Sequence, residues 1–298
     1  MKVVVCVKQT PSTTAVFSVK DGAVNWEDPG GKPNVVNPWD EYAIEEAIRF
    51  KENRGASDAV ALCLGDASSD EALKTCLAMG CSDAVLVSDP ALAGSDTLGT
   101  ARTLAAAIGK IGDVQVALFG KQAIDGDTGH TPVQVARVLG WTPLTYVSAI
   151  QSVDGGTITV ERLADDGKET VTAKLPVVIS VVKEINEPRY PSFMGIRKAS
   201  KAVIPTWSAG DIGVSAAPAK ADWSNVYPMP PREGEVEMIA ADSVEEQVRI
   251  LVNKLFEEKV ICAAECGSTS KIGTARSAPS AVRHWARRGS WPTEWGRP

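Results

Sequence analysis

Histidine is scarce in this 298-residue chain, which contains only His130 and His284, and none of its six cysteines belongs to a CxxC pair. Zinc sites usually combine closely spaced cysteines and histidines, so we expect no bound metal. The sequence also lacks the GxGxxG, GxxxxGKS/T, GxSxG and HExxH motifs. It therefore gives none of the usual evidence for a dinucleotide fingerprint, a P-loop, a serine hydrolase or a zinc protease, and it predicts no catalytic residue.

Long apolar runs are also missing, because no run reaches the roughly 18 residues that a membrane-spanning helix needs. Met1 and Lys2 lead directly into residues 3–7, which are too few and too β-branched for a signal peptide. The formal net charge of −6 argues against a nucleic-acid-binding protein, which would need clustered lysines and arginines. We therefore expect a cytoplasmic protein that binds no nucleic acid and does not insert into a membrane.

Short apolar runs alternate with helical patterns as far as residue 182. Strands are expected at residues 3–7, 58–64, 84–87, 114–119 and 177–182, which are nearly continuously apolar, as in a parallel sheet covered on both faces. Helices are expected to start at Asn37-Pro38, Ser69, Ser95-Asp96 and Thr131-Pro132. This alternation predicts an α/β fold with a doubly wound, mainly parallel sheet.

The first of these helices shows the clearest pattern. Asn37 is expected to supply the N-cap oxygen, and Glu45 is expected to pair with Arg49 on the outer face. The buried stripe is predicted from the apolar positions Ala43, Ile44, Ala47 and Ile48.

The pattern changes after the fifth strand. Residues 157–162 and 169–174 alternate in polarity and predict an antiparallel hairpin appended to the sheet. Beyond Val182 the chain is rich in proline as far as Pro231, and only 243–259 returns to a helical pattern. We expect an α/β domain over 1–205 and an extended C-terminal arm with a helix over 206–261.

The last 37 residues, 262–298, differ in composition from the rest. They carry six basic and two acidic side chains, against 25 and 35 in residues 1–261, and they show no helical or alternating period. We expect an irregular basic tail, which is either disordered, a docking arm or a non-native extension.

Ligands of an open α/β sheet bind outside the carboxyl ends of its strands, so the loops after Val7, Leu64, Val87 and Phe119 are the places to search. The last of these loops, residues 120–132, joins a strand to a helix through glycines and hydroxyl side chains, and helix N-terminal N–H groups can bind a phosphate. The alternative is an ordinary capped turn. Asp125 and Asp127 would oppose an anion unless they face away or cap the turn themselves.

A second unusual stretch runs from residue 184 to 201. Pro188 and Pro191 restrict the backbone, and Phe193 and Met194 form an apolar pair before Gly195. The pair is either core filler or an exposed anchor for a partner protein, because interface hot spots are rich in such side chains.

The same stretch carries a resemblance to a known family. Residues 182–190, VKEINEPRY, followed by a short loop and a Lys-rich helix, are similar to the signature of the β subunit of electron transfer flavoproteins. The resemblance is supported, in family order, by VCVKQ at 5–9, VNPWD at 36–40, LAMG at 77–80 and GKQAIDGDT at 120–128. It covers about residues 1–261.

The resemblance implies a Rossmann-like, adenine-nucleotide-binding fold in a heterodimeric electron carrier. A larger α subunit would hold the redox-active FAD, and the C-terminal helix of this chain would pack on that subunit. Electrons would pass from flavin dehydrogenases, such as the acyl-CoA dehydrogenases of fatty acid oxidation, to a quinone reductase or another acceptor. The segment that would dock into dehydrogenases is Pro191, Ser192, Phe193 and Met194.

The resemblance also implies that this chain carries an FAD or an AMP of its own. By position, the residues that would bind it are Cys6, Asn37, Leu64, Gly65, Asp96, Thr97, Asp127, Thr128, Gly129, His130 and Thr131. The turn at 125–128 and the stretch at 95–100 resemble members that bind a second FAD, whereas residues 129–132 depart from them, so we place FAD ahead of AMP. Two alternatives are an electron-bifurcating member that oxidises NADH, and a stand-alone adenine-nucleotide-binding enzyme or sensor.

Overall fold

Strand β1 (Lys2–Val7) organises the fold, because it pairs in parallel with β6 (Asp58–Leu64) on one side and with β8 (Val114–Gly120) on the other. The computed structural model describes residues 1–27, 34–215, 219–221, 226–228, 230, 234 and 236–260. The chain divides into a unit of residues 1–229 and a second unit that begins at residue 230. The tail predicted at 262–298 lies outside the described residues.

In the described part of the chain the main sheet has nine strands, in the spatial order β11-β10-β9-β12-β8-β1-β6-β7-β13. Its other strands are β7 (Asp83–Val87), β9 (Thr142–Asp154), β10 (Thr157–Ala164), β11 (Gly167–Lys174), β12 (Val177–Val181) and β13 (Thr206–Trp207). In this spatial order, each pair of neighbouring strands from β9 to β13 is parallel, whereas β10 is antiparallel to both β9 and β11. The predicted strands, the predicted hairpin and the doubly wound, mainly parallel sheet are therefore confirmed.

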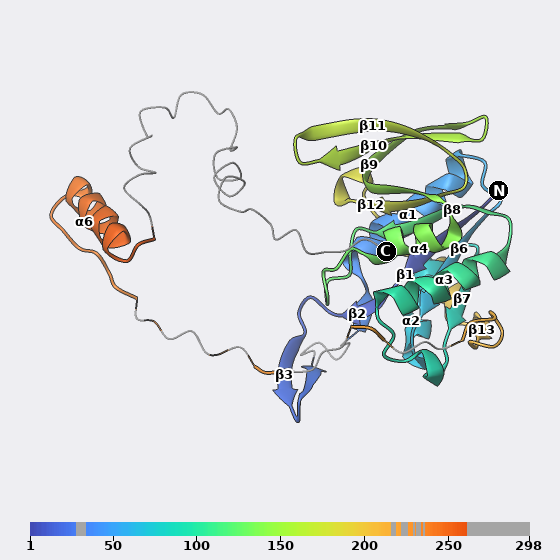
Figure 1. Ribbon diagram of the computed structural model, residues 1–298, viewed down its shortest axis with the longest axis horizontal. Helices are drawn as coiled ribbons and strands as arrows, with labels where there is room; N and C mark the ends of the chain where they lie inside the picture. The colour runs from blue at the N-terminus through green and yellow to red at the C-terminus, as the bar shows by residue number, and fades with distance from the viewer. Residues whose placement is uncertain are drawn as a thin grey trace, which may run out of the picture. The chain divides into compact units, whose positions relative to one another are not determined.

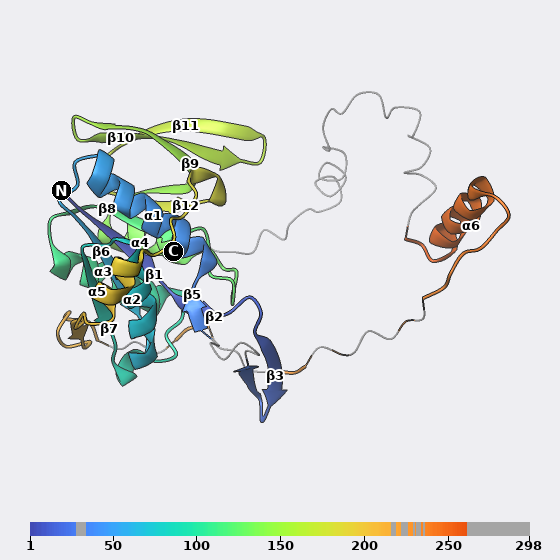
Figure 2. The same cartoon turned by 180° about the vertical axis from the view of Figure 1, so that it is seen from behind.

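Four helices cover the two faces of this sheet. Helices α1 (Pro38–Asn53) and α2 (Asp70–Met79) pack on one face, and α3 (Thr97–Ile111) and α4 (Thr131–Leu139) pack on the other. Figure 1 shows α3 and α4 in front of the sheet, and Figure 2, from behind, shows α1 and α2. Because the central strands run parallel, the loops that follow them gather at one edge of the sheet.

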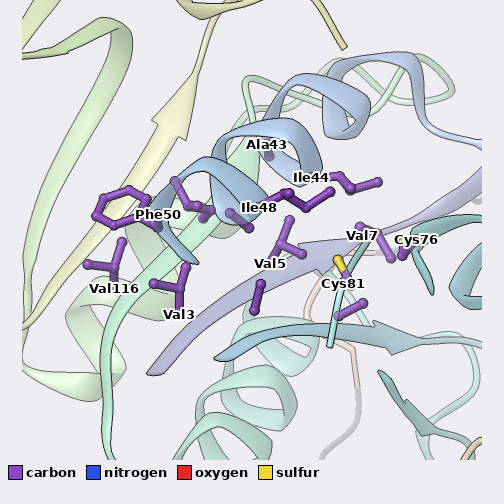
Figure 3. Packing of buried hydrophobic residues seen from close by; sticks show 14 of the residues in the cluster. Val3, Val5, Val7, Ala43, Ile44, Ile48, Phe50, Cys76, Cys81 and Val116 are labelled. Carbon is purple, nitrogen blue, oxygen red and sulfur yellow. The ribbon is translucent and has the colours of Figure 1, made fainter. Parts of the chain in front are cut away.

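Strand β1 explains the two-layered core. Val3, Val5 and Val7 pack with the α1 and α2 side, and Val4 and Cys6 pack with the α3 and α4 side. Figure 3 shows the first layer under α1. All five side chains are at most 6% exposed, and full burial of a valine stabilises a fold by about 1.5–3 kcal/mol. The apolar stripe predicted for α1 is confirmed as part of this layer.

Two predictions about α1 are wrong. Asn37 stands at the N-cap position, but its side chain makes no capping hydrogen bond and reaches the loop after β8 instead. Glu45 does pair with Arg49, but it lies inside the protein at 3% exposure, because a second arginine, Arg189, covers it. Both corrections involve long-range contacts that a helical pattern does not reveal.

The sequence does not predict β9 or two small antiparallel sheets. Residues 142–154 show neither a continuous apolar run nor strict alternation, and Tyr146 has a φ of 57° where the register with β12 shifts. The small sheets pair β2 (Gln9–Pro11) with β5 (Asn34–Val36), and β3 (Val16–Lys20) with β4 (Ala23–Glu27). Short 3-10 turns occupy Ala67–Ser69, Pro90–Leu92 and Lys183–Ile185.

The chain after β12 holds more regular structure than the sequence predicts. Helix α5 (Phe193–Ala199) packs on α2, and β13 adds to the sheet beyond residue 205, where the first domain is predicted to end. In the second unit, the helix predicted at 243–259 is present as α6 (Val244–Glu257), and most of its apolar side chains are exposed. None of the described helices is long and apolar enough to cross a membrane.

Candidate functional site

A cleft of about 1060 Å³ opens where β1, β6, β7 and β8 end. The chain runs from β1 to β6 and β7 on one side and then returns to β8 on the other, so the strand order reverses beside β1. Such a reversal separates the neighbouring loops, and ligands of α/β sheets bind in the resulting crevice. The position of the cleft therefore agrees with the four loops that the sequence singles out.

All the residues predicted to bind a nucleotide line this one cleft. They come from the carboxyl ends of β1 and β6, from the loops after β6, β7 and β8, and from the starts of α1, α3 and α4, and they are Cys6, Asn37, Leu64, Gly65, Asp96, Thr97, Asp127, Thr128, Gly129, His130 and Thr131. The structure thus brings together residues that are up to 125 positions apart. Their contact with a nucleotide stays a prediction.

Asp40, from the first turn of α1, fastens the floor of the cleft. One of its carboxylate oxygens accepts from the backbone N–H of Lys8 at 2.8 Å, and the other accepts from that of Gly120 at 3.2 Å. A Cβ on residue 120 would lie 2.4 Å from Asp40 Oδ1 and 2.6 Å from the carbonyl carbon of Trp39, so only glycine fits there. Asp40 thereby holds the ends of β1 and β8 at a fixed separation.

Burial dominates the chemistry of the acid and the thiol at this floor. It raises the pKa of Asp40 to about 7, against hydrogen bonds from Lys8, Asn37 and Gly120 that favour the charged form. Burial, and then the charge of Asp40, raise the pKa of the Cys6 thiol well above its ordinary value. Cys6 therefore stays protonated, and it packs as a small apolar side chain rather than acting as a nucleophile.

Asn37 ties α1 to the loop after β8. Its side chain is 1% exposed, donates to the carbonyl oxygen of Gln122 at 2.9 Å and accepts from the backbone N–H of Ile124 at 3.2 Å. Both ends of the amide are used, so residues 122–124 are held in one conformation. Asn37, which is predicted to bind the nucleotide, thus also fixes the shape of this loop at the cleft.

The aspartates of the cleft each accept a hydrogen bond from the protein. Lys8 Nζ lies 2.6 Å from Asp125, and Gln122 Nε2 donates to Asp127 at 2.7 Å. The other four are Asp40, described above, and Asp66, Asp89 and Asp96, which accept from backbone N–H groups. The repulsion that Asp125 and Asp127 would exert on a bound anion is reduced by these partners.

The N-terminus of α4 supplies the donors of the cleft. His130 stands at its N-cap but makes no capping hydrogen bond, and Thr131 and Pro132 begin the helix at the cleft wall. Asp127 and Gly129 have φ values of 49° and 61°, which turn the backbone sharply before the helix. Pro132 has no N–H group, and the N–H of Gln134 donates to the carbonyl oxygen of His130. This helix start therefore offers an anion the positive end of the helix dipole and backbone N–H groups such as that of Thr131.

Asp96, which the sequence predicts to bind the nucleotide, uses both of its carboxylate oxygens for hydrogen bonds within the protein. One oxygen caps α3 by accepting from the backbone N–H of Gly99, and the other accepts from that of Lys220, each at 2.8 Å. These bonds lower the pKa of Asp96. Asp96 therefore shapes the cleft wall by holding residues 219–221 beside α3.

Sequence reasoning missed Lys8, Asp40 and part of the loop after β7 as members of the cleft. The missed residues of that loop, which the sequence singles out only as a whole, are Ser88, Asp89, Pro90, Leu92, Ala93 and Gly94. The available signal was that polar residues directly follow apolar strands. Within the described residues, no group of three or more His, Cys, Asp or Glu side chains is arranged to hold a metal ion.

The segment predicted to dock into partner proteins lies outside the cleft. Phe193 is 80% exposed and Met194 68% exposed, so the interpretation of this pair as core filler is wrong. Ser192 caps α5 by accepting from the backbone N–H of Gly195 at 3.0 Å. Pro191 and Ser192 lie outside the helix, but Phe193 and Met194 already form the first turn of α5, where a loop is predicted.

Comparison with known proteins gives consistent matches. A family model described as the electron transfer flavoprotein domain matches residues 28–212. The chain is 39% identical over 266 residues to the caffeyl-CoA reductase-Etf complex subunit CarD of Acetobacterium woodii. It is 37% identical over 269 residues to an electron transfer flavoprotein subunit beta of Clostridium acetobutylicum, and 36% identical over 277 residues to one of Megasphaera elsdenii. Each match spans 88% of this chain and all of the relative.

Proposed function

The chain belongs to the β subunits of the electron transfer flavoprotein family, and from that membership we propose that it forms a heterodimeric electron carrier and holds an adenine nucleotide in the cleft after β1, β6, β7 and β8. The nucleotide is proposed because a helix N-terminus, a turn that contains glycine and an apolar wall meet in one cleft. The larger α subunit would hold the redox-active FAD.

The residues present fit an adenine nucleotide. The N–H groups at the start of α4 suit its phosphates, and the apolar wall formed by Cys6, Leu64 and Leu104 suits a purine ring. The cleft volume of about 1060 Å³ slightly exceeds the range of about 300–1,000 Å³ for small-molecule sites. That size favours FAD, the larger of the two nucleotides, over AMP.

Residues of this chain would bind and orient the nucleotide rather than react with it. Asn37 fixes the loop at 122–124, and Asp40 fixes the ends of β1 and β8, so the donors of α4 are in place before binding. Such preorganisation lowers the entropy lost on binding. A bound flavin would supply reversible electron uptake, which no side chain of this cleft provides.

Flavin dehydrogenases are the proposed electron donors, and acyl-CoA dehydrogenases are the first class to test. The name of the Acetobacterium relative places that protein in a complex with a reductase of a CoA thioester, which supports this choice. The exposed pair Phe193 and Met194, with Arg197 and Lys198 one turn further along α5, gives an apolar contact with a basic rim. Aromatic and methionine side chains are common at the centre of interfaces. The acceptor would be a quinone reductase, and in a bifurcating carrier the donor would be NADH.

The experiment is co-expression of this chain with an α subunit of the same family, followed by gel filtration and a reduction assay. The α flavin is monitored by its absorbance while an acyl-CoA dehydrogenase and its acyl-CoA substrate are added. We expect a stable αβ dimer whose flavin is reduced at a rate that saturates with carrier concentration. A chain that remains a nucleotide-binding monomer or homodimer beside the α subunit would contradict the proposal and favour a stand-alone nucleotide-binding protein.

A further inference from the structure

An arginine clamp fastens the segment before α5 to helix α1. The guanidinium group of Arg189 donates to Glu45 at 2.8 and 3.1 Å and to Glu52 through two contacts of 2.8 Å. The backbone N–H of Arg189 also donates to Glu45 at 3.2 Å. Two two-point contacts from one planar group fix the direction of the side chain as well as its distance, which a lysine could not do.

A second contact fastens the same segment three residues earlier. Asn186 Nδ2 donates to the carbonyl oxygen of Tyr42 at 3.0 Å and to Glu46 at 3.1 Å. Glu45 and Glu46 are only 3% and 1% exposed. Helix α1 thus turns two adjacent carboxylates toward the segment at 186–189, inside the protein, where ionised groups are costly unless they are paired.

The far end of the segment is held by close packing. Gly195, in the first turn of α5, lies so near to α2 that a Cβ on it would be 2.3 Å from the carbonyl oxygen of Ala78. Backbone atoms cannot move aside as a flexible side chain would. Helix α5 is therefore seated on α2 at the glycine, while Arg189 holds the chain to α1 only six residues earlier.

Three large side chains between these two attachments are exposed and mainly apolar. Tyr190 is 95% exposed, Phe193 80% and Met194 68%. Pro188 and Pro191 restrict the backbone beside them. Three exposed apolar groups on a segment attached at both ends contrast with the loose surface loops on which exposed side chains usually lie.

We propose that Arg189 and Glu52 are positioning residues, which hold Tyr190, Phe193 and Met194 in the arrangement that an electron-donating flavoprotein binds, without touching that partner themselves. This inference rests on the proposed docking role of Phe193 and Met194. The physical reason is that a contact surface fixed in advance loses less conformational entropy when a partner binds. Ion pairs of this kind add little to stability, and specifying one geometry is a role for which they can be retained.

The test compares three variants of the αβ dimer in the acyl-CoA dehydrogenase assay. Arg189→Lys keeps the charge and loses the two-point geometry, and Glu52→Gln breaks only the outer pair, whose carboxylate is 47% exposed. Glu169→Gln is the matched control, because it removes another Arg–Glu contact with a carboxylate 50% exposed, in the hairpin. We expect the KM for the carrier to rise about tenfold in Arg189→Lys and severalfold in Glu52→Gln. In Glu52→Gln, kcat and the melting temperature should stay unchanged. The control Glu169→Gln should change none of these quantities.

A double-mutant cycle separates positioning from a general structural role. Once Phe193→Ala has removed the main apolar group, Arg189→Lys should raise the KM little further, because coupled residues are not additive. Hydrogen exchange of the backbone at 190–196 should also be faster in Arg189→Lys than in the wild type. If Arg189→Lys does not fold, Glu52→Gln with Phe193→Ala completes the same cycle.

The failure of this inference and the failure of the docking proposal give different results. A KM that rises in Phe193→Ala but stays unchanged in both clamp variants, or rises additively in the double variant, would overturn the positioning role alone. A KM that is unchanged in Phe193→Ala would overturn the docking role and the inference with it. A raised KM in the Glu169→Gln control would also overturn the inference, because the effect would not be specific to this segment.

Discussion

The buried carboxyl group of Asp40 makes the stability of this protein depend on pH near neutrality. Burial raises its pKa from 3.8 to about 7. Between these two values the folded state keeps a proton that the unfolded state has released. The free energy of unfolding therefore falls as the pH rises through this interval, and the loss is complete above the folded pKa.

The size of the effect follows from the pKa of about 7. A group with this folded pKa lowers the free energy of unfolding by about 1.4 kcal/mol between pH 6 and pH 8. That difference corresponds to about 3–6 °C in melting temperature for a domain of this size. The carboxylates of Glu45, Glu52 and Asp96 have lowered pKa values, so they titrate in more acidic solution. Burial raises the pKa of Glu41, which therefore adds a slope of the same sign, and the loss of slope in Asp40→Asn measures the part that belongs to Asp40.

The assay is denaturant unfolding of the αβ dimer at pH 6, 7 and 8, with Asp40→Asn and Asp211→Asn beside the wild type. Asparagine cannot titrate, and its NH₂ group faces a backbone N–H, so Asp40→Asn should be less stable at every pH and should lose most of the slope. Asp211 is a carboxylate that accepts from Ser208 and has a lowered pKa, so its variant should keep the slope. If the free energy of unfolding increases from pH 6 to pH 8, or if its slope is equal in Asp40→Asn, then Asp40 does not cause the pH dependence.

The remaining predictions concern the cleft. Gly120→Ala should lower the free energy of unfolding by about 1–3 kcal/mol, because the added Cβ would meet backbone atoms. The control Gly109→Ala, at an open helical position, should raise it by about 0.5–1 kcal/mol. Both changes are measured by thermal melts, and an unchanged melt of Gly120→Ala would contradict the close packing. Asn37→Ala should cost about 1–2 kcal/mol, because it leaves two half-buried loop groups without their partner, and it should reduce nucleotide content on purification. Full stability would show that the loop keeps its conformation without Asn37. Gly129→Val should abolish nucleotide retention, because the φ of 61° and the position of Gly129 in the turn exclude a branched side chain. Thr131→Ala keeps its backbone N–H and should weaken retention only modestly. The amount of nucleotide released by heat is measured, and equal occupancy in the wild type and Gly129→Val would rule out this nucleotide site.

The parallel sheet was predictable because its strands are buried on both faces and so read as continuous apolar runs. Strand β9 and the hairpin of β3 and β4 could not be predicted in this way, because their exposed faces leave no continuous apolar run. The strand expected at 177–182 is present but ends at Val181. The loops at the cleft were predictable for a related reason. Each follows one of the buried strands, and parallel strands end at the same edge.

The contacts that shape the site could not be predicted from the sequence. Asp40 meets backbone groups 32 and 80 positions away, and Lys8 meets Asp125 across 117 positions. A local pattern offers Asn37 only as a helix cap, although its partners lie 85 and 87 positions further on. Such pairs depend on how the strands are ordered in space, which residue spacing alone does not determine.

The most direct test of the central claim is a count of nucleotides in the purified αβ dimer. Heat or acid extraction followed by chromatography separates FAD from AMP and gives the amount of each per dimer. We expect one adenine nucleotide beyond the FAD of the α subunit, with FAD ahead of AMP, and loss of that additional nucleotide alone in Gly129→Val. A dimer that transfers electrons but yields one FAD and no further adenine nucleotide would contradict it.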